Sequence, residues 1–91
     1  MHFADRDLKR YYEKGNASGI RPDWVRKVRR LLDRLEAAQS PDDLGGPQMG
    51  FHRLSGDMAG RYALTVSKNY RMTFAWRDGA AVEIRLEDYH G

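Results

Sequence analysis

The sequence predicts an α+β fold, in which two N-terminal helices pack on one face of a small antiparallel sheet. Apolar residues recur at helical spacing in the first half of the chain, whereas they alternate with polar residues in the second half. A stretch rich in glycine and proline, residues 41–50, separates the two halves. With 91 residues, the chain is expected to form a single domain, residues 1–91, with a modest core.

The first helix is expected over residues 5–14. Leu8, Tyr11 and Tyr12 are spaced so that they share one face of a helix. Gly15 follows at a position where glycine commonly ends a helix. These residues therefore predict a short amphipathic helix that turns one apolar face to the core.

A second, longer helix is expected to start near Pro22 and Asp23 and to end at Ser40-Pro41. Its apolar stripe consists of Trp24, Val28, Leu31, Leu32, Leu35 and Ala38. Arginines occupy the positions between, which is typical of a helix that covers a core with one face and meets solvent with the other.

The second half of the chain predicts strands. A short strand is expected over residues 51–54 and a turn over 55–60, followed by longer strands over 62–67, 69–77 and 80–88. A single core requires the apolar residues of the longer strands to face one side of the sheet. This core-facing set is Tyr62, Leu64, Val66, Tyr70, Met72, Phe74, Trp76, Val82, Ile84 and Leu86.

The alternation also constrains the last hairpin. A two-residue loop at Asp78-Gly79 would place Phe74 opposite Glu83, an apolar side chain beside a charged one. We therefore expect a three-residue loop, residues 77–79, with glycine in the left-handed position and Phe74 opposite Val82.

The preceding hairpin is expected to follow the same rule. A loop over residues 67–69 places Val66 opposite Tyr70 on the core side. Asn69 is expected in the left-handed conformation, for which asparagine is the best residue after glycine.

The other side of the sheet is expected to face solvent. Its residues are Ala63, Thr65, Arg71, Thr73, Ala75, Ala81, Glu83, Arg85, Glu87 and Tyr89. The expected register places Arg71 beside Thr65 and Arg85. A shallow face with small residues and arginines suits an extended polyanion better than a small apolar ligand, although an ordinary solvent-facing side of a half-covered sheet remains an alternative.

The charge distribution also favours a polyanionic partner. The net charge is +3, and most of the excess lies in the second helical segment. Its cations include Arg26, Lys27, Arg29, Arg30 and Arg34. Such a cluster suits a phosphate backbone, and a solvated helix face is the alternative.

The composition indicates a cytoplasmic protein without disulfides. The chain has no cysteine, which excludes disulfides and thiolate metal sites. No apolar stretch approaches the ~20 residues of a membrane span, and the charged N-terminus is unlike a signal peptide. We therefore expect no membrane association.

Sequence motifs resemble those of HigB-type toxins of the RelE superfamily. Residues 69–74, NYRMTF, resemble the family's N-[WY]-R-[IM]-T-F strand, and residues 87–90, EDYH, resemble its E-D-Y-H ending. Residues 54–62, LSGDMAGRY, are similar to its L-x-G-[DN]-x-x-G segment, and Phe3 with residues 13–15, EKG, is similar to its opening. The resemblance covers essentially the whole chain.

This resemblance implies a RelE-like fold of the microbial ribonuclease kind and a function. The protein would be the toxin of a type II toxin–antitoxin system, a ribosome-dependent endoribonuclease that cleaves mRNA and inhibits growth. Its partner would be a HigA-like helix-turn-helix antitoxin, and the complex would bind operator DNA. A catalytically inactive module that binds RNA or DNA through the basic helix is the alternative.

The expected catalytic residues are His90, Asp88, Tyr89 and Arg71. RNA cleavage by the 2′-hydroxyl needs an acid and a base, and imidazole titrates nearest neutral pH. The family's ending favours His90 for this role over a frayed tail, with Asp88 orienting it or acting as a base. Tyr89 could stack on a base, and Arg71 could hold the phosphate in bidentate fashion. The alternative for Arg71 is an ion pair with Glu83 or Glu87.

Further cations are assigned to RNA and ribosome binding. These are the helix cations Arg26, Lys27, Arg29, Arg30 and Arg34, together with Lys68 and Arg85. Some HigB toxins carry a catalytic lysine where this sequence has Ser55. Lys68, Arg53, Arg61 or Arg85 could replace that charge, or catalysis could rest on fewer groups.

The other histidines are not assigned to catalysis. His2 lies at a terminus, and His52 lies in a short strand where a structural role is expected. Scattered histidines without closely spaced carboxylates make a poor metal site. We expect no metal and no cofactor, because attack by a 2′-hydroxyl requires neither.

Overall fold

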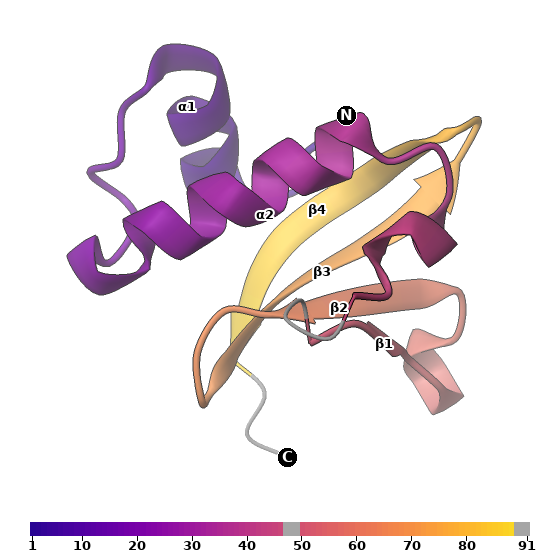
Figure 1. The fold of residues 1–91 in the computed structure, drawn as a ribbon. Coiled ribbons are helices and arrows are strands. Elements are labelled where there is room, and N and C mark those ends of the chain that lie inside the picture. Colours follow the sequence, from indigo (N-terminus) through magenta and orange to yellow (C-terminus); the bar gives the residue numbers. More distant parts are fainter. Residues whose placement is uncertain (47–49, 89–91) are drawn as a thin grey trace.

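A computed structural model describes residues 1–46 and 50–88 of the chain. It contains two α-helices, α1 (Arg6–Lys14) and α2 (Val25–Ala37), and the strands β1 (His52–Arg53), β2 (Arg61–Thr65), β3 (Tyr70–Arg77) and β4 (Ala80–Asp88). Short 3-10 turns span Pro22–Trp24, Pro41–Leu44 and Gly56–Met58. The strands form one antiparallel sheet in the order β1-β2-β3-β4, and both helices lie on one side of it (Figure 1). The predicted α+β fold is confirmed.

Helix α1 is defined by its two ends, of which the sequence predicted the stop at Gly15. The Asp5 side chain accepts hydrogen bonds from the backbone N–H groups of Asp7 and Leu8, at 2.9 and 3.2 Å. Its other carboxylate oxygen accepts a hydrogen bond from the N–H of Leu86 in β4, at 3.2 Å. Gly15 ends the helix with a φ of 71°. Asp5 therefore both starts α1 and ties it to the sheet.

Helix α2 supplies the largest apolar surface of the helical layer. Its buried residues are Val28, Leu31, Leu32 and Leu35. They share one core with Leu64, Met72, Phe74 and Ile84 of the sheet, all of which are 0% exposed. The predicted apolar stripe and the predicted core side of the sheet are confirmed at these positions. No helix in the described part of the chain is long and apolar enough to cross a membrane.

The connection between β3 and β4 differs from the prediction. Arg77 lies opposite Ala80, so the loop has two residues, Asp78 and Gly79, with φ angles of 54° and 79°. Two consecutive left-handed residues form the tight hairpin turn that Asp-Gly favours. The expected three-residue loop, residues 77–79, is therefore wrong. The two-residue turn would by itself put apolar residues of β4 on the wrong side of the sheet, and a second feature of β4 compensates for this.

That compensating feature is a β-bulge. Ala75 pairs with Val82, whereas Thr73 pairs with Arg85, so Glu83 and Ile84 both lie opposite Phe74. Glu83 has a φ of 51°, which is the left-handed conformation of a bulge residue. The extra residue changes which side chains face the core on either side of it.

The two-residue turn and the bulge together correct three predictions. Val82 does not lie opposite Phe74 or on the core side; instead Ala81, opposite Trp76, is 0% exposed. Arg71 lies opposite Glu87 and not Arg85. An alternating pattern alone does not reveal a bulge, because two alternating segments joined by one extra residue still look regular on each side.

The β2–β3 connection retains the predicted pairing. The N–H of Val66 donates to the carbonyl of Tyr70 at 3.0 Å, consistent with their expected positions. Asn69 does not take the expected left-handed conformation, because the only non-glycine residues with positive φ in the described ranges are Asp78 and Glu83.

Candidate functional site

The side of the sheet away from the helices, called here the open face, gathers polar side chains from all four strands. Strand register places these polar residues on it: His52 of β1, Arg61 and Thr65 of β2, Arg71, Thr73 and Arg77 of β3, and Arg85 and Glu87 of β4. Four arginines, including Arg77 and Arg61, share this face with the carboxylates of Glu83 and Glu87. The face is therefore positively charged overall.

One end of the open face is hollowed around Arg71. A cavity of about 240 Å³ is lined by His52, Leu54, Ala63, Thr65 and Arg71, and we call it the Arg71 hollow. Arg71 lies directly opposite Thr65 on one side and Glu87 on the other. The parity of the strand therefore places Arg71 away from the helices, as expected from the sequence, and the guanidinium has a carboxylate as its cross-strand neighbour.

The structure brings His52 to the same hollow. His52 pairs with Ala63, which puts it on the open face, and it is exposed. From the sequence, a structural role was expected for His52, which lies in a short strand. Phe51 packs against the core, and neighbouring residues of a strand face opposite sides. This alternation was the signal that could have placed His52 on the open face.

The expected catalytic end of the chain is only partly within the described residues. Asp88 ends β4 opposite Tyr70, immediately after Glu87, the neighbour of Arg71. Tyr89 and His90 lie outside the described residues. Asp88, the last described residue of β4, therefore lies one position further along the strand than Glu87, the residue opposite Arg71.

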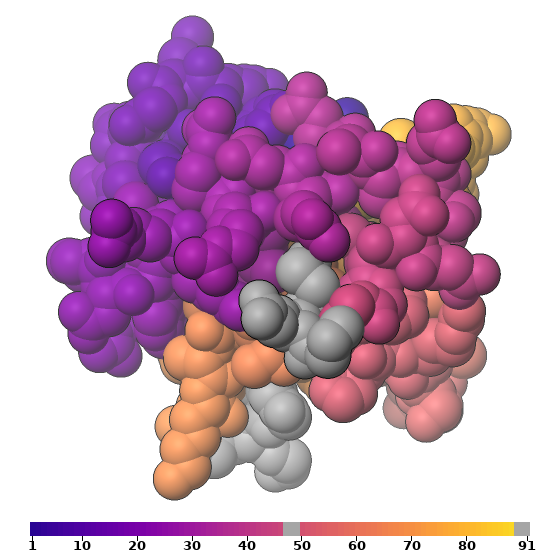
Figure 2. All heavy atoms as spheres, in the orientation of Figure 1, coloured from indigo at the N-terminus to yellow at the C-terminus, as the bar shows by residue number. Residues whose placement is uncertain are grey.

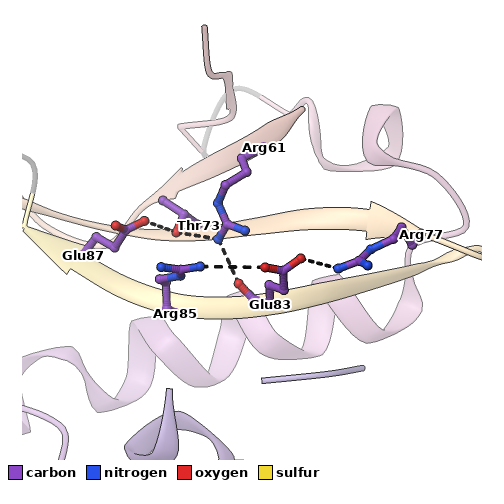
Figure 3. A network of polar contacts seen from close by, with 6 residues as sticks. All are labelled: Arg61, Thr73, Arg77, Glu83, Arg85 and Glu87. Atoms are coloured by element: carbon purple, nitrogen blue, oxygen red, sulfur yellow. Dashed lines mark hydrogen bonds and ion pairs between the residues drawn. The ribbon is translucent and has the colours of Figure 1, made fainter. Parts of the chain in front are cut away.

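The centre of the open face carries a network of polar contacts (Figure 3). Thr73 is 0% exposed; its hydroxyl accepts a hydrogen bond from Nη2 of Arg61 at 3.0 Å and donates one to Glu87. The same Nη2 donates to the backbone carbonyl of Glu83 at 2.8 Å. Burial lowers the pKa of Arg61, and the nearby charge of Arg85 lowers it further.

Glu83 links the remaining arginines of this network. Its carboxylate is paired with Arg77 and lies 3.9 Å from Arg85. Because the side chain of Glu83 is about 40% exposed, these ion pairs contribute little to stability. Their main effect is to orient the side chains on the face.

The cations of α2 form a separate surface on the helical side. Arg26, Arg29 and Arg30, with Tyr11, Val25 and Asp33, line an open cavity of about 570 Å³. Arg34 is also exposed, and Lys27 is half-buried. Figure 2 shows α2 at the surface of the molecule. The structure thus places the five predicted helix cations on the opposite side of the sheet from Arg71, and it places Lys68 in the exposed β2–β3 loop.

Together the fold and the open face define a class of protein: a small α+β protein with an arginine-rich sheet surface suited to an extended polyanion. Residues 1–90 match the sequence model of HigB-like toxins, described as RelE-like toxins of type II toxin–antitoxin systems. The chain therefore belongs to the HigB-like toxin family, which confirms the resemblance, and as a type II toxin it has an antitoxin partner.

Two relatives agree with this assignment over nearly their full length. Endoribonuclease HigB of Proteus vulgaris is 33% identical over 88 residues, which cover 97% of this chain and 96% of the relative. Toxin HigB-1 of Vibrio cholerae serotype O1 is 32% identical over 91 residues, which cover 98% of this chain and 96% of the relative.

Proposed function

We propose that this HigB-like toxin is an endoribonuclease that cleaves mRNA on its open face, in the cytoplasm and on the ribosome. The observation that carries the proposal is the Arg71 hollow, where a guanidinium and an imidazole line one cavity on a positively charged sheet. A phosphodiester is the ligand class that such a site fits. The relative named as an endoribonuclease supports the same reaction.

The proposed reaction is attack of a ribose 2′-hydroxyl on the adjacent phosphorus. A bond forms from the 2′-oxygen to phosphorus, and the bond from phosphorus to the 5′-oxygen breaks, which gives a cyclic phosphate and a free 5′-hydroxyl. A base takes the proton of the 2′-hydroxyl, and an acid supplies one to the leaving 5′-oxygen. Arg71 stabilises the charge that develops on the phosphate oxygens.

The proton-transfer groups are assigned to histidines. His90 is the primary acid or base, as proposed from the family's ending, with Asp88 orienting it and Tyr89 stacking on a base. His52 is the second imidazole, because it lines the Arg71 hollow. Two imidazoles on either side of one phosphate provide both an acid and a base near neutral pH.

The cations away from the hollow are proposed to hold the ribosome and the RNA. Arg26, Lys27, Arg29, Arg30 and Arg34 would contact ribosomal RNA phosphates without taking part in chemistry, and Lys68 and Arg85 would contact the substrate strand. The separation of α2 from the open face supports this division, since one side can dock while the other cleaves. The antitoxin is proposed to be HigA-like, with a helix-turn-helix domain, and the complex to bind operator DNA.

The test is expression without the antitoxin, followed by cleavage with purified components. The wild type should arrest growth and cleave ribosome-bound mRNA. His90→Gln should abolish cleavage while retaining ribosome binding, and Arg71→Ala should lower the cleavage rate on the order of a hundredfold or more. Arg71→Lys should recover part of the rate, because an ammonium makes no bidentate contact.

The same variants separate an enzyme from a binding module. Lys9→Gln, a change on the exposed side of α1, is a control for altered net charge and should cleave as the wild type does. If His90→Gln and Arg71→Ala still arrest growth at equal protein levels, the protein acts by binding, and the catalytic proposal is wrong.

A further inference from the structure

Arg61 lies across the open face, with its guanidinium extending toward β4. It starts on β2, opposite Ala75 of β3. Its Nη2 reaches Thr73 on β3 and the Glu83 carbonyl on β4, at 3.0 and 2.8 Å (Figure 3). One side chain therefore spans three strands and fixes a guanidinium over the centre of the sheet.

The β-bulge supplies one of the two groups that hold Arg61. In a regular antiparallel ladder the carbonyls point within the sheet toward neighbouring strands. At a bulge the extra residue is left out of the ladder, so its carbonyl is available to a side chain above the sheet. Glu83, with a φ of 51°, is that residue, and its carbonyl accepts from Arg61. The bulge thus creates the acceptor that orients the guanidinium.

Both groups that hold Arg61 are electrically neutral. They are a hydroxyl and a carbonyl, and no ion pair joins Arg61 to a carboxylate within residues 1–46 and 50–88. The nearby carboxylates have other contacts: Glu87 with Thr73, and Glu83 with Arg77 and Arg85. A half-buried guanidinium without a direct ion pair is costly, and a bound anion would reduce that cost.

The surroundings of Arg61 increase that cost. Arg85 lies opposite Thr73, the residue that Arg61 contacts, so two cations flank the same point of the sheet. Burial, and then the charge of Arg85, lower the pKa of Arg61, and the charges of Glu87 and Glu83 offset this only in part. Nε of Arg61 and Nε of Arg85 are buried and have no hydrogen-bond partner in the described part of the chain.

We propose that Arg61 and Arg85 form a second phosphate-binding site for the RNA strand, next to the Arg71 hollow, and that Thr73 and the Glu83 carbonyl position Arg61 within it. Thr73 and Arg71 are two residues apart on one face of β3, a separation of about 7 Å. Neighbouring phosphates of a nucleic-acid strand are separated by a similar distance. A phosphate at Arg61 would therefore place the adjacent phosphate at Arg71.

This inference rests on the proposed ribonuclease function and assigns a substrate-positioning role to residues outside the chemistry. Arg61 binds the strand one phosphate from the cleaved bond. Thr73 is a positioning residue, because it acts on the RNA only through Arg61. The carboxylate of Glu87, which accepts a hydrogen bond from Thr73, lies between the two sites. Its negative charge reduces the repulsion between the guanidinium groups of Arg61 and Arg71.

The test pairs a change in the protein with a change in the RNA. The substrate is a ribosome-bound mRNA in which a neutral methylphosphonate replaces one phosphate, either immediately 5′ or immediately 3′ of the cleaved bond. Single-turnover cleavage is measured for the wild type, Arg61→Gln, Arg61→Lys and Thr73→Val, with Lys9→Gln as the control. Circular dichroism and thermal unfolding verify that each variant folds.

The expected loss for Arg61→Gln on normal mRNA is roughly 10- to 100-fold in the apparent second-order rate constant, as for a hydrogen bond to a charged group. One of the two methylphosphonates should lower the rate constant of the wild type by a similar factor. The same methylphosphonate should lower the rate constant of Arg61→Gln little further, because the contact with that phosphate is already lost. Thr73→Val should show part of this coupling, and Arg61→Lys should retain part of the rate.

The outcomes are distinguishable. If the wild type cleaves mRNA but the effects of Arg61→Gln and of both methylphosphonates simply multiply, no phosphate binds at Arg61, and this inference is wrong while the proposed function stands. Should the wild type cleave no mRNA, the proposed function fails and this inference with it. Should Thr73→Val fold poorly, the Arg61 variants still decide the question.

Discussion

Asp5 joins the start of α1 to the edge of β4, and its replacement gives a sharp test of what holds the helical layer on the sheet. One carboxylate oxygen accepts from the N–H groups of Asp7 and Leu8, and the other accepts from the N–H of Leu86. Asp5→Ala removes both functions. Loss of a helix N-cap costs about 0.5–2 kcal/mol, and a half-buried N–H left without its acceptor costs about 1–3 kcal/mol.

The expected loss for Asp5→Ala is therefore about 1.5–5 kcal/mol of unfolding free energy. In a domain of this size each kcal/mol lowers Tm by about 4–8 °C. Asp5→Ser separates the two contributions, because serine is a good N-cap but has only one side-chain oxygen. It should lose the contact with Leu86, keep the cap of α1, and fall between Asp5→Ala and the wild type.

The assay is urea and thermal unfolding followed by circular dichroism, in a His90→Gln background so that the protein can be produced without its partner. The midpoint should shift without a change in the denaturant slope. An Asp5→Ala variant within about 0.5 kcal/mol of its parent, the size of an ordinary surface change, would refute the reasoning. Equal stability of Asp5→Ser and the parent would show that the contact with Leu86 contributes nothing.

Three further predictions follow from other parts of the structure. Glu83→Gly should be more stable than Glu83→Gln by about 1 kcal/mol in urea unfolding, because glycine adopts the left-handed conformation without the cost that a Cβ imposes. Equal stability of the two variants would contradict the left-handed bulge conformation. The hydrogen bond from the Tyr12 hydroxyl to Glu36 raises the pKa of Tyr12 to about 12 from 10.0. Since this folded-state pKa is raised, the stabilisation is complete below about pH 10 and is lost as the pH rises toward 12; tyrosinate absorbance of the wild type should contain a late component that Tyr12→Phe lacks. Replacing several α2 cations by alanine should weaken ribosome binding and flatten its salt dependence, measured by co-sedimentation at several salt concentrations; unchanged binding at low salt would make the helix a solvated surface. The cations to replace are Arg26, Lys27, Arg29, Arg30 and Arg34.

Local sequence determined most of the helical layer and the side of the sheet that carries the site. Asp5 and Gly15 end α1 through contacts with near neighbours, so their effect is readable without the tertiary structure. Strand alternation is also local, which is why the sequence places Leu64 and Phe74 in the core and Arg71 on the open face.

Only the tertiary structure decided how the last strand aligns with its neighbour. The two-residue turn at Asp78-Gly79 turns Ala81 to the core, and the bulge at Glu83 pairs Arg71 with Glu87 and frees the carbonyl that holds Arg61. His52 likewise reached the Arg71 hollow only through the pairing of β1 with β2. Alternation gives the face of each residue within one strand, but the alignment between strands depends on turn geometry and packing across the whole sheet, which no single segment of the sequence encodes.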